Sequence, residues 1–268
     1  MRKASILAVV AVALVAGPAL GATITIKFNG TDGQSSCLWW AGWSTMCNTN
    51  TGAEPGRVLL SRPGDDWYFP AALLMPVLPA DFAGATVNSA TLAMKETWWN
   101  GYKYDGVELH NVTQAWTAGN GTAAGRWGPE HSGAGKWFSN YDATSQTGVD
   151  WQGNTVNRAT ALSNNYTFDT TAMGTLIDTQ NGVGNGARTT FDVLTWAQNI
   201  ASGAWANNGL AIWMGNAVRQ DGLLGGTLDE RFTAATTDGL TIDYTPIPEP
   251  ATVALLAFGG LGLLRRRK

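Results

Sequence analysis

Aromatic residues crowd one short stretch of the sequence in a way that favours contact with a ligand. The stretch "ETWWNGYKYDG" places Trp98 beside Trp99 and follows them with Tyr102 and Tyr104. Because successive side chains of an extended chain point to opposite sides, at least one of the two tryptophans should reach solvent. The flat apolar face of an aromatic ring suits stacking on the C–H side of a sugar ring. We therefore predict that these four residues form a polysaccharide-binding ridge.

Other tryptophans allow two interpretations. Trp127, Trp137 and Trp151 fall in the Gly- and Asn-rich stretch 117–165, which we expect to be a long ordered loop, because disordered segments are poor in aromatic residues. These residues either pin the loop by packing, which is the more common role, or contact a ligand, and we include Trp127 and Trp137 among the candidate ligand-binding residues. A second group lies in patterned segments and is predicted to pack in the core: Trp116, Trp196 and Trp213.

Groups that could catalyse a reaction are present, but none stands at a diagnostic spacing. A glycosidase needs two carboxylates at a suitable separation, and the sequence offers several without fixing their distances in space: Asp65, Asp66, Glu96, Asp105 and Glu108. Neither His110, which belongs to a strand-like pattern, nor His131, in a loop, stands in a nucleophile motif. We expect a protein without catalytic activity, cofactor or metal site. A polysaccharide-degrading enzyme is the less favoured alternative.

The N-terminus has the three parts of a secretory signal peptide. Arg2 and Lys3 supply positive charge, an uncharged apolar run follows, and Ala19-Leu20-Gly21 fits the small residues of a cleavage site. Residues 1–22 are therefore predicted to be a signal peptide, cut after Gly21 or Ala22. The protein is expected to leave the cytoplasm, and an uncleaved N-terminal anchor is the alternative.

A second apolar segment closes the chain, in "PIPEPATVALLAFGGLGLLRRRK". The triplet Pro248, Glu249 and Pro250 comes first, and an apolar run follows that is shorter than the ~20 residues of an ordinary membrane helix. A cluster of cations ends the chain: Arg265, Arg266, Arg267 and Lys268. This order of parts closely resembles the PEP-CTERM sorting signal.

The resemblance implies a route and a processing partner. Residues 246–268 would insert transiently in the cytoplasmic membrane as a short helix, and the membrane enzyme exosortase would cleave near the Pro-Glu-Pro triplet. The body would then reach the cell envelope, the cell surface or the medium. A plain tail anchor is the alternative.

The two cysteines of the chain, Cys37 and Cys47, enclose the aromatic segment "CLWWAGWSTMC". A close pair of cysteines in an exported chain favours a disulfide that closes a short loop. The scattered His and Cys residues lack the spacing of zinc ligands. We therefore predict a bridge between Cys37 and Cys47.

Charge and composition narrow the class of protein. Without the six cations near the two chain ends, 11 basic residues face 20 acidic ones, which gives a net charge near −9. This charge argues against nucleic acid as a partner. Charged residues make up only 14% of the chain, whereas it contains 33 glycines and 13 tryptophans. Such a composition favours an extracellular β-protein over a helical enzyme.

Residues 23–245 show short strand patterns separated by loops. Ile24, Ile26 and Phe28 alternate with polar residues, as in a strand with one buried face. Other strand patterns occur within 66–79, 85–99, 105–112, 209–215 and 239–246. One helix is predicted within 190–203, with Asp192 as its cap and Gly203 as its stop. The sequence therefore predicts an all-β, two-sheet, jelly-roll-like sandwich with long loops and one short helix.

Several short motifs of this body resemble the DNRLRE family, whose members are β-sandwiches that include carbohydrate-binding modules. The matching segments are Ser89-Ala90-Thr91-Leu92, Val112-Thr113-Gln114-Ala115-Trp116, Phe191-Asp192-Val193 with Trp196, and Asn208-Gly209-Leu210. The family's Arg-x-Phe-Asp strand is blurred in "AALLMPVLP", and Arg231-Phe232 keeps only a trace of its late loop. The resemblance implies an exported, non-catalytic protein that binds polysaccharide. A structural or adhesive envelope protein without a sugar site is the alternative.

Overall fold

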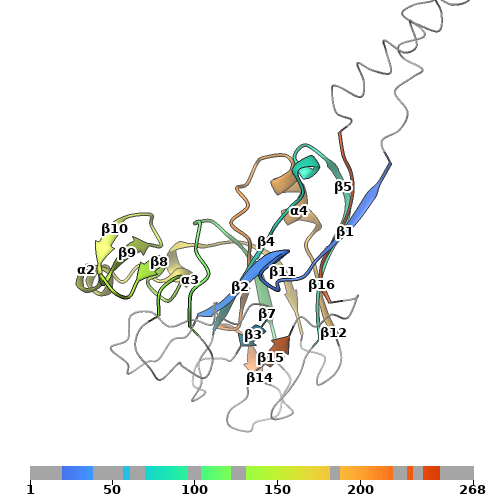
Figure 1. The fold of residues 1–268 in the computed structure, drawn as a ribbon. Helices are drawn as coiled ribbons and strands as arrows, with labels where there is room; N and C mark the ends of the chain where they lie inside the picture. The colour runs from blue at the N-terminus through green and yellow to red at the C-terminus, as the bar shows by residue number, and fades with distance from the viewer. Residues whose placement is uncertain are drawn as a thin grey trace, which may run out of the picture.

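The computed structural model describes residues 20–38, 57–60, 70–95, 104–121, 131–181, 188–219, 228–231 and 238–247. Within these residues, two antiparallel sheets face each other and enclose the main hydrophobic core (Figure 1). The prediction of an all-β sandwich with a short helix is confirmed.

The first sheet joins the two ends of the folded body. Its strand order is β1-β16-β5-β12, with the bounds β1 Ala22–Ile26, β16 Gly239–Thr245, β5 Thr86–Lys95 and β12 Arg188–Asp192. The predicted alternation is present, since Ala90 and Leu92 of β5 are buried while Thr91 between them is exposed. Ala22 pairs with Tyr244, so the first and last strands of the body lie side by side.

The second sheet is buried on both of its faces near its centre. Its strand order is β11-β7-β13-β4-β2, with the bounds β11 Met173–Gln180, β7 Val107–Val112, β13 Leu210–Trp213, β4 Ala71–Pro76 and β2 Gly33–Leu38. In β4, Ala72 and Leu74 face the first sheet, whereas Ala71 and Leu73 join a second cluster on the outer face. Burial on both faces explains the continuous apolar sequence of β4, as predicted.

The predicted helix is α4 (Leu194–Ala201), which packs against β5. Asp192 Oδ1 accepts a hydrogen bond from the backbone N–H of Leu194 at 2.9 Å, which satisfies one of the unpaired donors at a helix start. Gly203 follows the helix with a φ of 75°, a left-handed conformation that glycine adopts at low cost. Trp196 is fully buried. The N-cap residue is Val193, one position after the predicted cap Asp192. The predicted stop and core residue are confirmed.

A small lobe covers the outer face of the five-stranded sheet (Figure 1). The lobe holds a sheet of order β10-β9-β8 and two short helices, with the bounds β8 Phe138–Asp142, β9 Thr147–Asp150, β10 Thr155–Asn157, α2 Arg158–Asn164 and α3 Phe168–Thr171. Trp151 and Phe168 meet edge to face at 5.0 Å. Both pack in one cluster with Leu73 and Trp213 of the sheet, so aromatic packing holds the lobe in place.

The lobe corrects the expectation of a long loop over 117–165. Its strands are three to five residues long and carry mostly polar side chains, so they show no clear period-two pattern of apolar residues. Close pairing of the backbones forms them instead. At Gly148, for example, a Cβ atom would lie 2.3 Å from the backbone oxygen of Asn140, so this pairing needs glycine.

The sandwich has two distinct ends. The start of β1 and the end of β16 lie at one end, together with α4 and the short helix η1 (Ala80–Phe82) (Figure 1). Two short ribbons lie at the opposite end: β6 (Tyr104–Asp105) with β14 (Val218–Arg219), and β3 (Arg57–Leu60) with β15 (Leu228–Arg231). The first ribbon continues the pairing of β7 with β13 beyond the sheet.

Candidate functional site

Two polar residues of β7 face away from the main core. Val107 and Leu109 of this strand pack in the core between the sheets, so Glu108 and His110 point to the outer face. Glu108 pairs with Trp213 of β13, and paired residues of antiparallel strands share a face. The outer face near the start of β7 therefore carries a carboxylate, an imidazole and an indole side by side.

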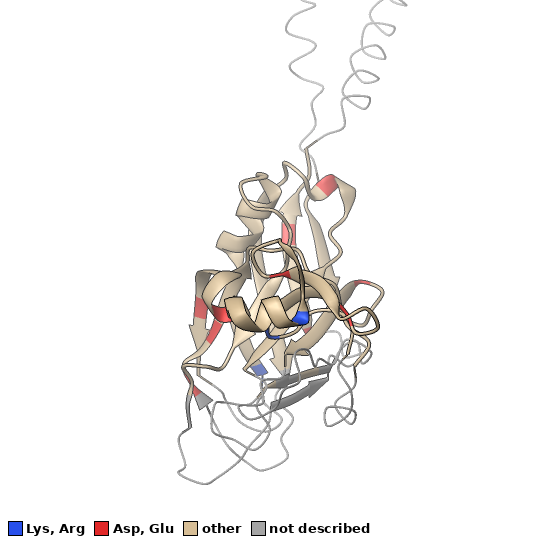
Figure 2. Ribbon diagram, turned by 90° about the vertical axis from the view of Figure 1, so that its left-hand side faces the viewer, with Lys and Arg blue, Asp and Glu red and all other residues tan. Residues whose placement is uncertain are grey.

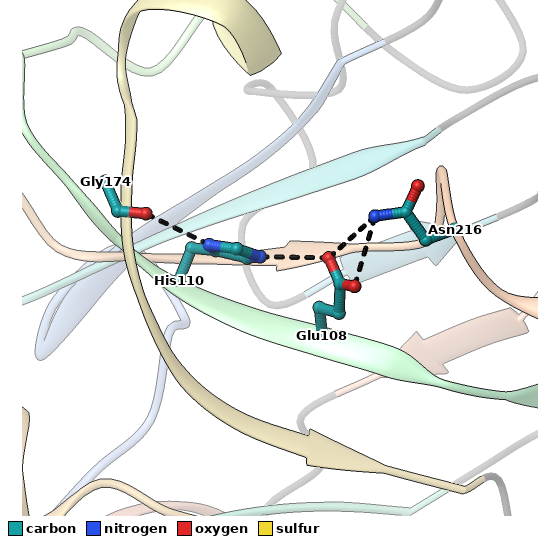
Figure 3. Close-up of polar contacts among 4 residues, drawn as sticks. All are labelled: Glu108, His110, Gly174 and Asn216. Carbon is teal, nitrogen blue, oxygen red and sulfur yellow. Dashed lines mark hydrogen bonds and ion pairs between the residues drawn. The ribbon is translucent and has the colours of Figure 1, made fainter.

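A chain of polar contacts fixes the carboxylate of Glu108 (Figure 3). Asn216 Nδ2 donates to both carboxylate oxygens at 3.1 Å. His110 Nε2 lies 3.0 Å from Glu108 Oε2, and His110 Nδ1 lies 3.1 Å from the backbone oxygen of Gly174. The carboxylate is thus held from two sides. We name Glu108, His110 and Asn216 the β7 polar cluster.

A bulge in β11 supplies the carbonyl group that orients His110. The pairing of β11 with β7 shifts register twice, between Met173 and Leu176 and again before Asp178. At Gly174, inside the bulge, a Cβ atom would lie 2.7 Å from Thr113 Cγ2. An added Cβ atom would also lie 3.0 Å from the backbone oxygen of Asn111 in β7, so glycine favours this close approach, which brings the carbonyl oxygen to the imidazole.

The β7 polar cluster has the chemistry of a binding site for hydroxyl groups. His110 is buried, Glu108 keeps 19% of its side chain exposed, and Asn216 is exposed. A carboxylate and an amide together offer hydrogen-bond acceptors and donors, and a held geometry lowers the entropy cost of binding. Among the described residues, no second carboxylate joins this cluster. No group of three metal-ligating side chains occurs in the same part of the chain.

The structure describes only part of the predicted aromatic ridge. Trp98, Trp99, Tyr102 and Trp127 lie outside the described residues. The backbone of Tyr104 lies in β6 and pairs with Arg219 of β14. This ribbon leads directly into β7, so the end of the predicted ridge is four residues from Glu108 along the chain.

Trp137 lies in the small lobe, next to β8, and is 9% exposed. Its indole Nε1 donates to Asn165 Oδ1 at 3.3 Å, and the Lys136 ammonium lies 4.6 Å from the ring centre. Burial lowers the pKa of Lys136, and the negative charge of Asp169 opposes this effect. These contacts show Trp137 as part of the packing of the lobe.

The other described tryptophans are core residues. Trp116, Trp196 and Trp213 are at most 6% exposed, which confirms their predicted place in the core. Trp151 is also buried, and its Nε1 donates to the backbone oxygen of Gly135 at 2.9 Å. Trp151 therefore has a packing role and fixes the segment around it.

The predicted disulfide is described at only one of its ends. Cys37 is fully buried in β2 and packs in the main core. Cys47 lies outside the described residues. The bridge between the two cysteines stays a prediction.

Side-chain contacts hold the last strand of the body, β16, against η1 just before the segment with the Pro-Glu-Pro triplet. Tyr244 donates its hydroxyl hydrogen to Asp81 Oδ1 at 3.0 Å, and its ring meets Phe82 edge to face at 5.3 Å. Burial and the hydrogen bond to Asp81 raise the pKa of Tyr244. Ile247, although exposed, lies against Gly84, where an added Cβ atom would be 2.8 Å from its Cδ1.

Comparison with known families identifies this C-terminal segment. Residues 246–268 match the family described as the PEP-CTERM protein-sorting motif. The chain carries an exosortase sorting signal. The protein is therefore exported and sorted by exosortase to the cell envelope, as the sequence predicted. The motif begins directly after Thr245, the last residue of β16.

Two further findings concern the rest of the chain. A comparison with curated proteins finds no match. Within the described residues, no helix combines the length and the apolar character needed to cross a membrane. The expected C-terminal helix and the residues Pro248, Glu249 and Pro250, like 1–19, lie outside that part of the chain.

Sequence reasoning missed the β7 polar cluster as a unit. Glu108 and His110 are two positions apart in a predicted strand, and this spacing places two polar groups on one face. Asn216 follows them by more than 100 residues and stands in no motif. Only the pairing of β13 with β7 brings it to the carboxylate.

Proposed function

We propose that this exported protein binds a polysaccharide of the cell envelope without chemically altering it. The observation that carries the proposal is the fixed carboxylate of Glu108, which His110 and the exposed Asn216 hold in place on the outer face of a sheet. Sugar hydroxyls both donate and accept hydrogen bonds, and a held carboxylate–amide pair complements them.

The position of the predicted ridge supports the same site. Tyr104 ends the ridge and precedes Glu108 by four residues, a distance of at most about 14 Å along an extended chain. An aromatic surface that stacks on a sugar ring, next to polar groups that bind its hydroxyls, is the arrangement we expect of a polysaccharide site. The resemblance of the body to the DNRLRE family points in the same direction.

We further propose that this site faces away from the membrane. The sorting motif starts at the end of the sandwich where β16 finishes, and the β6–β14 ribbon next to Glu108 lies at the opposite end (Figure 1). While the C-terminal segment holds the protein at the membrane, the proposed site would face outward. A polymer outside the cell could then be held without steric conflict.

Charge favours a neutral polymer. Acidic positions are spread over the described body and basic ones are sparse (Figure 2), in agreement with the excess of acidic residues in the sequence. A polyanionic polysaccharide would be repelled over distances of about 10 Å at moderate salt. We therefore propose neutral exopolysaccharide as the ligand class.

Affinity electrophoresis tests this proposal, with the protein purified from the envelope of its host and with neutral or acidic polysaccharide in the gel. We expect retardation by the neutral polymer only. Asn216→Ala and Glu108→Gln should each weaken the retardation roughly tenfold, the effect of one or two lost hydrogen bonds. Asn140→Ala and Asp32→Asn are matched controls, because both residues are exposed and distant from the cluster in the sequence.

The second candidate is a structural or adhesive envelope protein without a sugar site. The observation that favours it is the burial of Trp116, Trp151, Trp196 and Trp213, which fill the interior and present little surface to a ligand. If this alternative holds, no polysaccharide retards the protein in the gel, and Trp99→Ala migrates like the parent protein. Equal retardation of Asn216→Ala and the parent protein would reject the proposed site.

A further inference from the structure

We infer that His110 positions Glu108 through one proton shared between the two side chains, so that polysaccharide binding depends on this proton. The inference rests on the proposed function, because it assigns Glu108 as the ligand-binding carboxylate. His110 itself is buried and does not touch the ligand. It acts through Glu108 and is therefore a positioning residue.

The contacts of the imidazole fix the number of hydrogens. His110 Nδ1 lies 3.1 Å from the backbone oxygen of Gly174, and a carbonyl oxygen only accepts, so Nδ1 carries a hydrogen. His110 Nε2 lies 3.0 Å from Glu108 Oε2. A neutral ring with its hydrogen on Nδ1 would turn a lone pair toward an ionised carboxylate. A second hydrogen, on Nε2 or on Glu108, converts this repulsion into a hydrogen bond.

Within the part of the chain that the structure describes, the strands on either side of β7 offer no other group that could take over the proton. On β11, the register partner of His110 is Leu176 and that of Glu108 is Thr179. On β13, the partners are Ala211 and Trp213. Among the described residues, the further polar contacts of the pair are those with the Gly174 carbonyl and the Asn216 amide. Neither of these groups titrates in the pH range of a histidine.

Loss of the proton would therefore change the shape of the site. The carboxylate would keep its contact with Asn216 but lose its donor on the opposite side, and it would turn away from His110. The imidazole side chain is only 9% exposed, so water has little access to replace the missing contact. We expect polysaccharide affinity to fall by roughly tenfold, the effect of losing one charge-assisted hydrogen bond.

Nitrogen NMR can follow this proton directly, because the chain has two histidines. The variant His131→Gln leaves His110 as the sole imidazole, and it should bind polysaccharide like the parent protein. At pH values where binding is strong, both ring nitrogens of His110, or one nitrogen and Glu108, should carry hydrogens. As the pH is changed, the loss of this second hydrogen and the loss of polysaccharide binding should have the same pH midpoint.

Two further variants separate positioning from a purely structural role. In His110→Gln, the amide N–H can still donate to Glu108 but does not titrate, so binding should persist and lose its pH dependence. In Glu108→Gln, the carboxylate that shares the proton is gone, so the nitrogen spectrum of His110 at one fixed pH should differ from that of the parent protein. This second measurement needs no polysaccharide and applies even if His110→Gln does not fold.

The outcomes are distinct. A His110→Gln variant whose binding titrates like the parent overturns the inference. So does a His110 nitrogen spectrum that is the same with and without the Glu108 carboxylate. If the parent protein binds no polysaccharide at any pH, the proposed function fails. The NMR comparison in Glu108→Gln then still supports or overturns the shared proton on its own.

Discussion

Removing the hydroxyl group of Tyr244 tests how much one hydrogen bond next to the sorting motif contributes to the stability of the folded body. Tyr244 is 2% exposed, its hydroxyl donates to Asp81 Oδ1 at 3.0 Å, and its ring packs on Phe82. Tyr244→Phe keeps the ring and its packing and deletes only the donor. The variant therefore isolates one hydrogen bond between the last strand, β16, and η1.

The magnitude follows from the exposure of the acceptor. Asp81 is exposed, so its carboxylate can regain a hydrogen bond from water when the phenol is lost. We therefore expect a loss near 1 kcal/mol, in the middle of the range for a single hydrogen bond. For a domain of this size, that loss corresponds to a fall in the melting temperature of roughly 2–4 °C. Urea unfolding at pH 7 gives the free energy of unfolding directly.

The pH dependence gives a second, independent readout. Because the pKa of Tyr244 is raised in the folded protein, folding favours the protonated phenol. This contribution to stability is complete below the ordinary tyrosine pKa of about 10 and is lost as the pH rises through the folded value. The parent protein should therefore lose stability above pH 10, and Tyr244→Phe should lose less over the same range.

Tyr166→Phe is the matched control, because it also removes one phenol hydroxyl, from a half-buried tyrosine of the small lobe. It should leave the free energy of unfolding nearly unchanged. Asp81→Asn in a double-mutant cycle measures the coupling to Tyr244. A Tyr244→Phe variant with the stability and alkaline behaviour of the parent protein would refute the reasoning.

Three more predictions concern the bulge, the cysteines and the processing of the ends. Gly174→Ala should destabilise the protein by about 1–3 kcal/mol in urea unfolding, because its Cβ would lie 3.0 Å from a backbone oxygen of β7; wild-type stability would show that the bulge adjusts freely. Thiol labelling of the denatured, unreduced protein should find Cys37 and Cys47 unreactive, and two reactive thiols would exclude the bridge. Intact-mass measurement on envelope material should show a chain that lacks the residues up to Gly21 and those after Pro250, and a retained hydrophobic tail in a host with active exosortase would contradict the processing.

Local patterns were sufficient for β1, β4, β5, β7, β13, β16 and α4, whereas no strand was predicted at the positions of β2, β11 and β12. In β1, Ile26 and the following Phe28 are buried as their alternation indicated, and α4 lies within the predicted segment and ends before the predicted stop, Gly203. These signals depend on side chains close in sequence, because a strand repeats every two residues and a helix is bounded by its own capping groups. The sorting segment was equally readable, since its parts stand in one continuous order.

The small lobe could not be recognised in the same way. Its short strands carry polar residues and take their stability from backbone pairing and from Trp151 and Phe168, which pack on the five-stranded sheet. The burial of Trp151 depends on a surface formed by β4 and β13, which are distant from it in the sequence. Local periodicity holds no information about such a surface.

The candidate site, too, was predictable only in part from the sequence. The sequence by itself determined the C-terminal sorting signal, the class of fold and the place of Glu108 and His110 on one face of a strand, because each follows from residues near one another in the chain. Only the tertiary structure decided that Asn216 reaches the carboxylate and that Gly174 reaches the imidazole. Those contacts depend on the pairing of β7 with β13 and β11, and strand pairing over long sequence separations is set by the packing of the whole core.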